Sequence, residues 1–306
     1  MKIAIIGRTE TLYKTISILL KAGHEICALI TAKEAPEYKK TARDFEEIAQ
    51  DLNIPYASTA RIHTVADILE GCGAEIGISM NYTGIIPQNI IDLFPQGILN
   101  AHGGDLPRYR GNACQAWAII NGEDKIGLCI HKMIGSELDS GDIIMREYLP
   151  LDLQTTITQV YEWFDGRIPE LFVSAVSKLA ADPNFILERQ STASKDILRC
   201  YPRKPEDGRI NWSITAEEII RLINASNKPY AGAFAKYSGQ KLIVWAAELV
   251  NDHECFCAIP GQVTLVGKEY VEVACGKGKI KLLQVQIDDV VGPPSNWITS
   301  IRDRLS

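Results

Sequence analysis

No stretch of this 306-residue chain stays apolar for the roughly 18 residues that a membrane-spanning helix needs. The opening run 1–7 is apolar but short, so we expect a buried strand there and no secretory signal peptide. The eight cysteines form no CxxC pair and most lie in apolar segments, which is typical of reduced thiols in a cytosolic protein. The sequence therefore predicts a cytoplasmic globular protein that does not enter a membrane.

Glycine is scarce where nucleotide-binding proteins concentrate it. Gly7 is the only glycine in the turn after the first expected strand, whereas a dinucleotide fingerprint needs three, and no P-loop occurs. NAD and ATP are therefore disfavoured. Cys255 and Cys257 lack further ligands at zinc spacing, so we predict no metal site. Four histidines show no ligand spacing and are expected to be structural or exposed: His24, His63, His131 and His253.

Basic residues are in the minority, with 32 Lys and Arg against 38 Asp and Glu and a formal net charge of −6. Residues 203–306 hold 13 basic and 12 acidic side chains, so the acidic excess lies in residues 1–202. Neither part offers the strongly basic surface that binding to a nucleic-acid backbone requires. We therefore expect no nucleic-acid partner.

The chain contains a regular alternation of strand and helix patterns. Strands are expected at 2–7, 25–31, 54–56, 76–80, 97–99, 126–133 and 143–149, with helices between most of them and a long helix over 154–182. This alternation predicts an α/β class fold with a Rossmann-like parallel sheet and helices on both faces.

A polar, turn-rich segment at 203–208 separates this α/β pattern from a different pattern that follows it. One helix is expected near 215–225, followed by short strands with glycine turns at 231–237, 241–249, 259–266, 270–275 and 279–287. Such strands predict a small OB-like β-barrel. We therefore expect a catalytic domain over 1–202 and a C-terminal domain over 203–306.

Three side chains carry the most chemical information. Asn100 and His102 follow one apolar strand two residues apart, so an extended backbone would project both to the same face. Asp139 follows another strand, in the segment Leu138–Asp142 (LDSGD). An amide can hold a developing oxyanion, an imidazole can move a proton, and a carboxylate can orient the imidazole. Together they are the parts needed to transfer an acyl group to an amine.

Asn100-x-His102, Leu106–Gly111 (LPRYRG) and Leu138–Asp142, in this order and spacing, resemble the signature of enzymes that use 10-formyltetrahydrofolate. These include methionyl-tRNA formyltransferase, sugar N-formyltransferases and glycinamide ribonucleotide transformylase. Segments 203–212, 229–234 and 240–245 resemble the C-terminal barrel shared by the tRNA and sugar enzymes. The likeness is to the formyltransferase half of the bifunctional enzyme that modifies UDP-4-amino-4-deoxy-arabinose.

The resemblance implies that Asn100, His102 and Asp139 are catalytic and that 10-formyltetrahydrofolate is the co-substrate. It also implies a folate pocket at two loops, with the contacts Met80, Tyr82, Gly84, Ile85, Ile86, Pro87, Glu137, Leu138 and Asp142. Ligands generally bind at the carboxyl ends of parallel strands, which supports this placement.

The acceptor is expected to be a UDP- or dTDP-linked amino sugar of surface glycan biosynthesis, because the charge balance disfavours RNA. The alternative is methionyl-tRNA formyltransferase, and a third hypothesis is a non-catalytic binding module. Many relatives carry Ser-Leu where this chain has Gly104-Asp105. Acceptor contacts are expected at Asp105, Arg108, Tyr109 and Trp117. A homodimer formed through the second domain is compatible with this interpretation.

Overall fold

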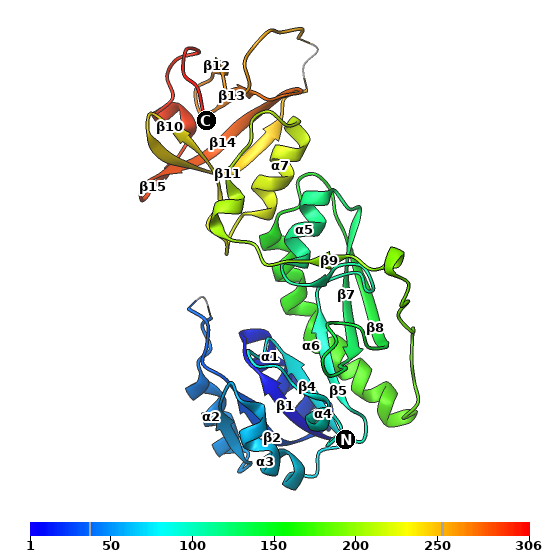
Figure 1. The fold of residues 1–306 in the computed structure, drawn as a ribbon. Helices are drawn as coiled ribbons and strands as arrows, with labels where there is room; N and C mark the ends of the chain where they lie inside the picture. Colours follow the sequence, from blue (N-terminus) through cyan, green and yellow to red (C-terminus); the bar gives the residue numbers. More distant parts are fainter. Residues whose placement is uncertain (37, 252–253) are drawn as a thin grey trace. The chain divides into compact units, whose positions relative to one another are not determined.

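The structure is a computed structural model that describes residues 1–36, 38–251 and 254–306, and these divide into two compact units (Figure 1). The first unit comprises Met1–Gly111, Gly127–Tyr148 and Glu162–Cys200. The second comprises Asn112–Ile126, Leu149–Tyr161 and Tyr201–Ser306. Two internal segments therefore group with the C-terminal part, and the domain boundary at 202 stays a prediction.

The first unit is built on a seven-stranded sheet in the order β3-β2-β1-β4-β5-β7-β8. Its strands are β1 (Lys2–Gly7), β2 (Glu25–Thr31), β3 (Tyr56–Ser58), β4 (Ile76–Met80), β5 (Ile98–His102), β7 (Lys125–Lys132) and β8 (Ile143–Pro150). Neighbours from β3 to β5 run parallel, whereas β7 runs antiparallel to β5. The α/β class is confirmed, and the sheet is mixed where a wholly parallel one was expected.

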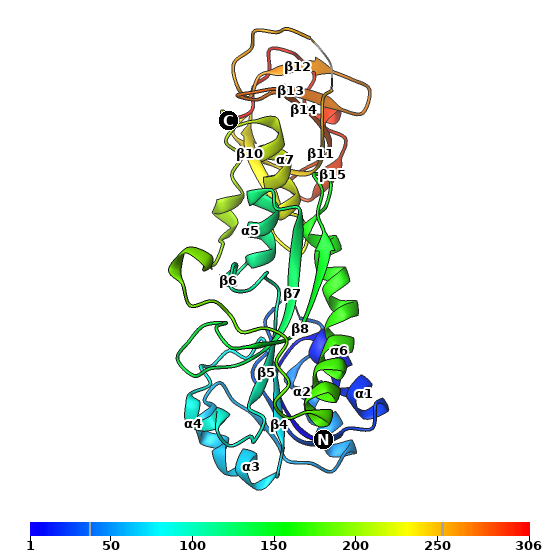
Figure 2. The ribbon, with the colours of Figure 1, turned by 90° about the vertical axis from the view of Figure 1, so that its right-hand side faces the viewer.

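Helices cover both faces of this sheet, which explains why its central strands are apolar throughout. In β1 every residue after Lys2 is buried, as is typical of a parallel strand with helices on both sides. Figure 2 shows α3 and α4 on one side of the sheet and α1 and α6 on the other. The helices of the chain are α1 (Glu10–Lys21), α2 (Ala42–Asp51), α3 (Ala66–Gly71), α4 (Gln88–Ile91), α5 (Cys114–Asn121), α6 (Ile157–Ala181) and α7 (Ala216–Ala225).

Shorter elements occur in both units. Four 3₁₀ turns span Ile62–Val65, Ser194–Asp196, Pro205–Gly208 and Pro294–Asn296 in the described chain. A two-stranded parallel ladder joins β6 (Arg110–Gly111) to β9 (Arg199–Cys200). This ladder was not expected from the sequence, because two-residue strands carry no periodicity. None of the helices in the described ranges is long and apolar enough to cross a membrane.

The second unit contains an antiparallel sheet in the order β10-β11-β14-β13-β12, with β15 paired to β14. Its strands are β10 (Ala233–Tyr237), β11 (Gln240–Leu249), β12 (Val263–Val266), β13 (Val271–Ala274), β14 (Lys279–Ile287) and β15 (Val290–Gly292). Helix α7 starts at a capping box formed by Thr215 and Glu218 and contributes three buried isoleucines to the core of this sheet. The predicted second β domain is confirmed.

The last residues of the chain join the two end strands of this sheet. Lys236 and Ser306 exchange backbone hydrogen bonds of 2.6 and 3.0 Å beside β10. Val263 N–H, at the start of β12, donates to the Asp303 carbonyl at 3.1 Å, and Leu305 N–H donates to the Gly261 carbonyl at 2.8 Å. The hydrogen bonding therefore continues from β12 to β10 through residues 303–306, which satisfies the edge groups that an open sheet would leave exposed.

The core of the first unit allows a direct test of packing. Phe45 on α2 is fully buried and meets the Tyr13 ring edge-on, with 5.6 Å between the ring centroids. Replacing Phe45 with Ala should lower the free energy of unfolding by about 3–5 kcal/mol, because a cavity replaces the ring. Urea denaturation of the whole protein measures the change in the free energy of unfolding. Leu20→Ala, at a helical position that is 36% exposed, is the control and should change it by about 0.5 kcal/mol. Equal effects would contradict the packing.

Candidate active site

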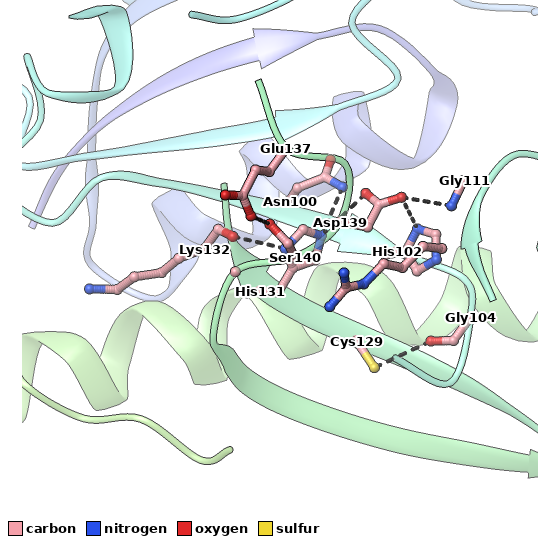
Figure 3. Close-up of polar contacts among 12 residues, drawn as sticks. Asn100, His102, Gly104, Gly111, Cys129, His131, Lys132, Glu137, Asp139 and Ser140 are labelled. Atoms are coloured by element: carbon pink, nitrogen blue, oxygen red, sulfur yellow. Dashed lines mark hydrogen bonds and ion pairs between the residues drawn. The ribbon is translucent and has the colours of Figure 1, made fainter. Parts of the chain in front are cut away.

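Strand β5 carries the first two side chains of the site. Asn100 and His102 lie two residues apart on this strand and project to the same face. Their partners on β7 are His131, opposite Asn100, and Cys129, opposite His102. His102 is only 7% exposed. The site therefore lies on the sheet itself, where β5 pairs with β7, and the His102 imidazole is shielded from bulk water. Figure 3 shows these side chains together.

The Asp139 carboxylate faces His102 from the loop between β7 and β8. Its Oδ2 lies 3.5 Å from His102 Nδ1 and accepts a 2.9 Å hydrogen bond from the Gly111 N–H (Figure 3). The other imidazole nitrogen, Nε2, lies 2.6 Å from the Tyr109 carbonyl oxygen. Because a carbonyl only accepts, this contact requires a proton on Nε2. Both ring nitrogens thus face acceptor oxygens, an arrangement suited to an imidazole that holds and passes a second proton.

Two glycines permit the close backbone approaches that shape this site. A Cβ at Gly104 would lie 2.7 Å from His102 Nε2 and would collide with the Tyr109 carbonyl. A Cβ at Gly141 would overlap the Lys132 carbonyl oxygen. The segment after β5 needs glycine at position 104, and the Asp139 loop needs glycine at position 141, because any side chain there would collide with the neighbouring backbone. Asp139 itself adopts a φ of +50°, in the left-handed region that Asp tolerates better than most residues.

His131 lies against these residues and is buried, so of the two expectations for it, structural or exposed, the exposed one is wrong. The side chain is 2% exposed, and its Nε2 lies 3.3 Å from Asn100 Nδ2 and 3.7 Å from Asp139 Oδ1. Its Nδ1 lies 2.9 Å from the Lys132 carbonyl oxygen. The antiparallel pairing of β7 with β5 places it there. The sequence pattern predicted a wholly parallel sheet, in which this pairing does not occur, so the position of His131 beside Asn100 was not predicted.

Burial lowers the pKa of His131 from 6.5 to about 4. The neighbouring Asp139 carboxylate and the Lys132 carbonyl oppose this shift in pKa, whereas electrostatic interactions with His102 and Arg110 add to it. The imidazole of His131 is therefore neutral in the folded protein at neutral pH. This matters for its hydrogen bonds, because a neutral imidazole has one donor and one acceptor nitrogen.

Gln190 connects the Asp139 loop to strand β6. Its amide nitrogen donates to the carbonyl oxygens of Asp139, at 2.8 Å, and Gly141, at 2.7 Å. Its amide oxygen accepts from the Arg110 guanidinium at 2.7 and 3.2 Å. Arg110 precedes the Gly111 N–H that holds the Asp139 carboxylate. Gln190 is 51 residues from Asp139 in sequence, and no local pattern marks it.

The two loops expected to contact folate lie side by side. Gly135 N–H donates to the Gln88 side chain at 2.8 Å, which joins the 133–142 loop to the segment after β4. Three side chains near this junction leave large apolar surfaces exposed: Ile85 (84%), Ile134 (40%) and Leu138 (43%). Ile134 was not anticipated. A group of exposed apolar side chains beside a polar site is typical of a surface that a ligand covers.

The remaining residues of the expected folate pocket have structural contacts as well. The Tyr82 hydroxyl donates to the Thr59 carbonyl at 2.7 Å, and Gly84 lies against the Ala60 carbonyl. Ile86 is buried in the core. Met80 ends β4, Pro87 is the N-cap of α4, and Glu137 and Asp142 lie in the Asp139 loop. Their roles as ligand contacts stay predictions.

The expected acceptor contacts fall in different places. Asp105 is paired with the Arg146 guanidinium and accepts a 3.0 Å hydrogen bond from the Tyr148 hydroxyl. Arg108 is exposed, with its guanidinium 5.6 Å from the centroid of the buried Tyr109 ring. Trp117 lies in the second unit, where its indole N–H donates to the Tyr201 carbonyl at 2.9 Å. Their roles toward an acceptor stay predictions.

Across the described residues, no group of three or more His, Cys, Asp or Glu side chains is placed to hold a metal ion. Cys255 and Cys257 are exposed, and so is His63, while His24 is partly buried near the N-terminus. His253 lies outside the described residues.

The amide and the imidazole on β5 and the carboxylate on the loop after β7 are the groups that acyl transfer uses, and they lie in an α/β unit of a chain that also has a β domain. Sequence models of two domains match the chain: "Formyl transferase" over residues 1–176 and "Formyl transferase, C-terminal domain" over residues 203–297. The chain therefore belongs to the formyl transferase family.

Two groups of known proteins resemble the chain. Methionyl-tRNA formyltransferases from Acetivibrio thermocellus and Rickettsia bellii are each 29% identical, over 294 and 293 residues, which is 94% of this chain and 92% of theirs. Among solved structures, a Helicobacter canadensis N-formyltransferase with folinic acid and dTDP-3-aminofucose has a TM-score of 0.68 and 18% identity, covering 92% of this chain and 99% of that one. HypX from Aquifex aeolicus with tetrahydrofolic acid has a TM-score of 0.63 and 16% identity. The match covers 98% of this chain but only 47% of HypX.

Replacing Gln190 with Leu should loosen the Asp139 loop, because it leaves the Asp139 and Gly141 carbonyls without their donor. We expect the free energy of unfolding to fall by about 1–3 kcal/mol. Amide hydrogen exchange over residues 136–142 should accelerate. Gln154→Leu, at an exposed position, is the control and should change neither quantity. Unchanged amide hydrogen exchange over residues 136–142 in the Gln190→Leu variant would contradict the role of Gln190 in holding this loop.

The low pKa of His131 predicts a specific pH dependence of stability. The unfolded chain binds a proton near pH 6.5 that the folded chain binds only near pH 4, so acidification through this window favours unfolding. The free energy of unfolding should fall by up to about 1.4 kcal/mol per pH unit there from this group alone. The difference between wild type and His131→Gln, measured by urea denaturation at each pH, isolates the effect. Parallel curves would show that His131 is not buried in its neutral form.

Proposed function

We propose that this protein transfers the formyl group of 10-formyltetrahydrofolate to the amine of a nucleotide-linked amino sugar. The observation that carries the proposal is the convergence of Asn100, His102 and Asp139 in one shielded site, with His102 between the Tyr109 carbonyl and the Asp139 carboxylate. A binding module has no need of this combination, whereas formyl transfer to an amine uses each member.

In the proposed reaction the acceptor nitrogen attacks the formyl carbon, and the bond from that carbon to the folate nitrogen then breaks. Asn100 Nδ2 donates to the formyl oxygen as it gains negative charge. His102 accepts the proton that the attacking nitrogen loses. Asp139 stabilises the resulting imidazolium and helps pass the proton to the departing folate nitrogen. The products are a formamide and tetrahydrofolate.

The donor is proposed to lie against the exposed apolar side chains of Ile85, Ile134 and Leu138. A planar heterocycle would bury this surface while its polar edge bonds to the backbone of the two loops that Gln88 joins. Relatives of similar fold bind tetrahydrofolic acid or folinic acid, which supports a folate donor. Met80, Tyr82, Gly84, Ile86, Pro87, Glu137 and Asp142 are the remaining proposed contacts.

The charge balance supports a small acceptor over a nucleic acid. The chain has a sequence pI of about 5.5, whereas binding to an RNA backbone draws on clustered basic side chains. Structural relatives include a sugar 3N-formyl transferase, WlaRD, solved with dTDP and 5-N-formyl-THF, with a TM-score of 0.68 and 20% identity. Asp105, Arg108, Tyr109 and Trp117 are the proposed acceptor contacts.

Methionyl-tRNA formyltransferase activity is the second candidate. The observation in its favour is the 29% identity to enzymes of that name along nearly the whole of both chains. The two candidates share the donor, the fold and the three catalytic side chains. They differ in the size and charge of the acceptor, so an acceptor assay separates them directly.

Incubation with 10-formyltetrahydrofolate and a panel of UDP-, dTDP- and GDP-linked amino sugars should give one sugar product heavier by a single formyl group, read by mass spectrometry. Charged initiator tRNA is assayed in parallel. Turnover on the tRNA and on none of the sugars would overturn the sugar assignment.

The same assay tests the catalytic residues. Asn100→Ala should lower kcat about 100- to 1,000-fold, as expected for loss of an oxyanion donor. His102→Ala should lower kcat about 100- to 10,000-fold, as expected for loss of a general base. His63→Ala, at an exposed position, is the matched control and should leave kcat unchanged. Wild-type kcat in either of the first two variants would contradict its role.

A further inference from the structure

We propose that His131 is a positioning residue that orients the side-chain amide of Asn100, by accepting a hydrogen bond from Asn100 Nδ2 at its own Nε2. This inference rests on the proposed function, because that function assigns Asn100 to the formyl oxygen. His131 is then a second histidine of the site, and its role involves no proton transfer. Figure 3 shows the imidazole of His131 beside the Asn100 amide and apart from the His102 ring.

The backbone selects the tautomer of His131. Its Nδ1 lies 2.9 Å from the Lys132 carbonyl oxygen, and a carbonyl oxygen can only accept. The ring hydrogen is therefore on Nδ1, and in the neutral ring Nε2 keeps a lone pair. Burial maintains the neutral ring at neutral pH, as its lowered pKa indicates. His131 thus presents an acceptor to the site.

That acceptor decides which way the Asn100 amide faces. The NH2 and oxygen ends of an amide are nearly equal in size, so packing alone does not distinguish them. Only the NH2 end can donate to the lone pair on His131 Nε2, and Nδ2 lies 3.3 Å from it. The second hydrogen on Nδ2 is then available to a formyl oxygen. The reversed amide would set an oxygen against both the lone pair and the developing oxyanion.

The contacts of Asp139 agree with this assignment. Asp139 Oδ1 lies 3.7 Å from His131 Nε2, beyond hydrogen-bond distance, as expected for two acceptors. The carboxylate instead bonds to Gly111 N–H and faces His102 Nδ1. Asp139 therefore pairs with His102, and His131 pairs with Asn100. The direct pairing of Asn100 with His131 in the β5–β7 ladder places the two side chains as cross-strand neighbours.

The kinetic test removes the acceptor and asks whether the effect passes through Asn100. His131→Met replaces the ring with an apolar side chain, and we expect kcat to fall about 10- to 100-fold while KM for both substrates changes less than about threefold. This loss should not exceed that of an oxyanion donor itself. His131→Gln, which offers an amide oxygen, should recover part of the loss. Ile130→Val, a buried change next to it on β7, is the control and should leave kcat within about twofold.

The double variant distinguishes positioning from general damage to the site. In an Asn100→Ala background, His131→Met should lower kcat by less than about twofold, because the group it orients is gone. An equal loss in both backgrounds would overturn the proposal. Thermal unfolding of each variant identifies any that fail to fold.

A spectroscopic test does not depend on the acceptor or on turnover. In protein labelled with ¹⁵N-histidine, with His131 assigned through His131→Gln, we expect the Nδ1–H tautomer and an unprotonated Nε2 between pH 6 and 8. Asn100→Ala should shift the Nε2 resonance. An Nε2–H tautomer, or a resonance that Asn100→Ala leaves in place, would overturn the inference. Failure of all acceptors with the expected tautomer would count against the proposed function alone.

Discussion

The antiparallel pairing of β5 with β7 is the constraint on which the rest of the site depends. It sets Asn100 opposite His131 and His102 opposite Cys129, so that side chains from two strands share one face. β7 ends at Lys132 beside Leu99, near the start of β5, and the loop that follows β7 brings Asp139 back to His102 at the other end of β5. The opposition of Asn100 to His131 and of His102 to Cys129 follows from this antiparallel register.

The polar groups around this pairing are bonded to one another, as buried polar groups must be. Tyr109 supplies a carbonyl to His102, and Gly111 supplies an N–H to Asp139. Gln190 donates to the Asp139 carbonyl and accepts from the Arg110 guanidinium, which links the two segments. In surroundings of low dielectric such bonds are stronger than in water, and leaving one unmade costs more. The site is thereby pre-organised before any ligand binds. This suits a reaction whose main requirement is the placement of donors around a developing charge.

The fold and the three catalytic candidates concern the formyl donor and the transfer, and they leave the choice of acceptor open. Relatives with sugar acceptors and relatives named for tRNA share this architecture. One fold often carries several functions, and the difference lies in loops and surface charge. In this chain Asp105 is engaged with Arg146 and Tyr148, so it contributes to holding its own loop. The acidic balance of the whole chain favours a small acceptor.

The sequence by itself determined the α/β class, the positions of most strands and helices and the second β domain, and it singled out Asn100, His102 and Asp139 as catalytic candidates. Apolar periodicity and short motifs depend on residues close together in sequence, so they predict individual strands, helices and motif residues. Only the tertiary structure decided the direction of β7, the burial of His131, the hydrogen bonds of Gln190 and the closure of the C-terminal sheet by residues 303–306. These depend on contacts such as Asn100 with His131 and Arg110 with Gln190, which join residues 31 and 80 positions apart. No periodicity within one segment records which distant segment it will meet.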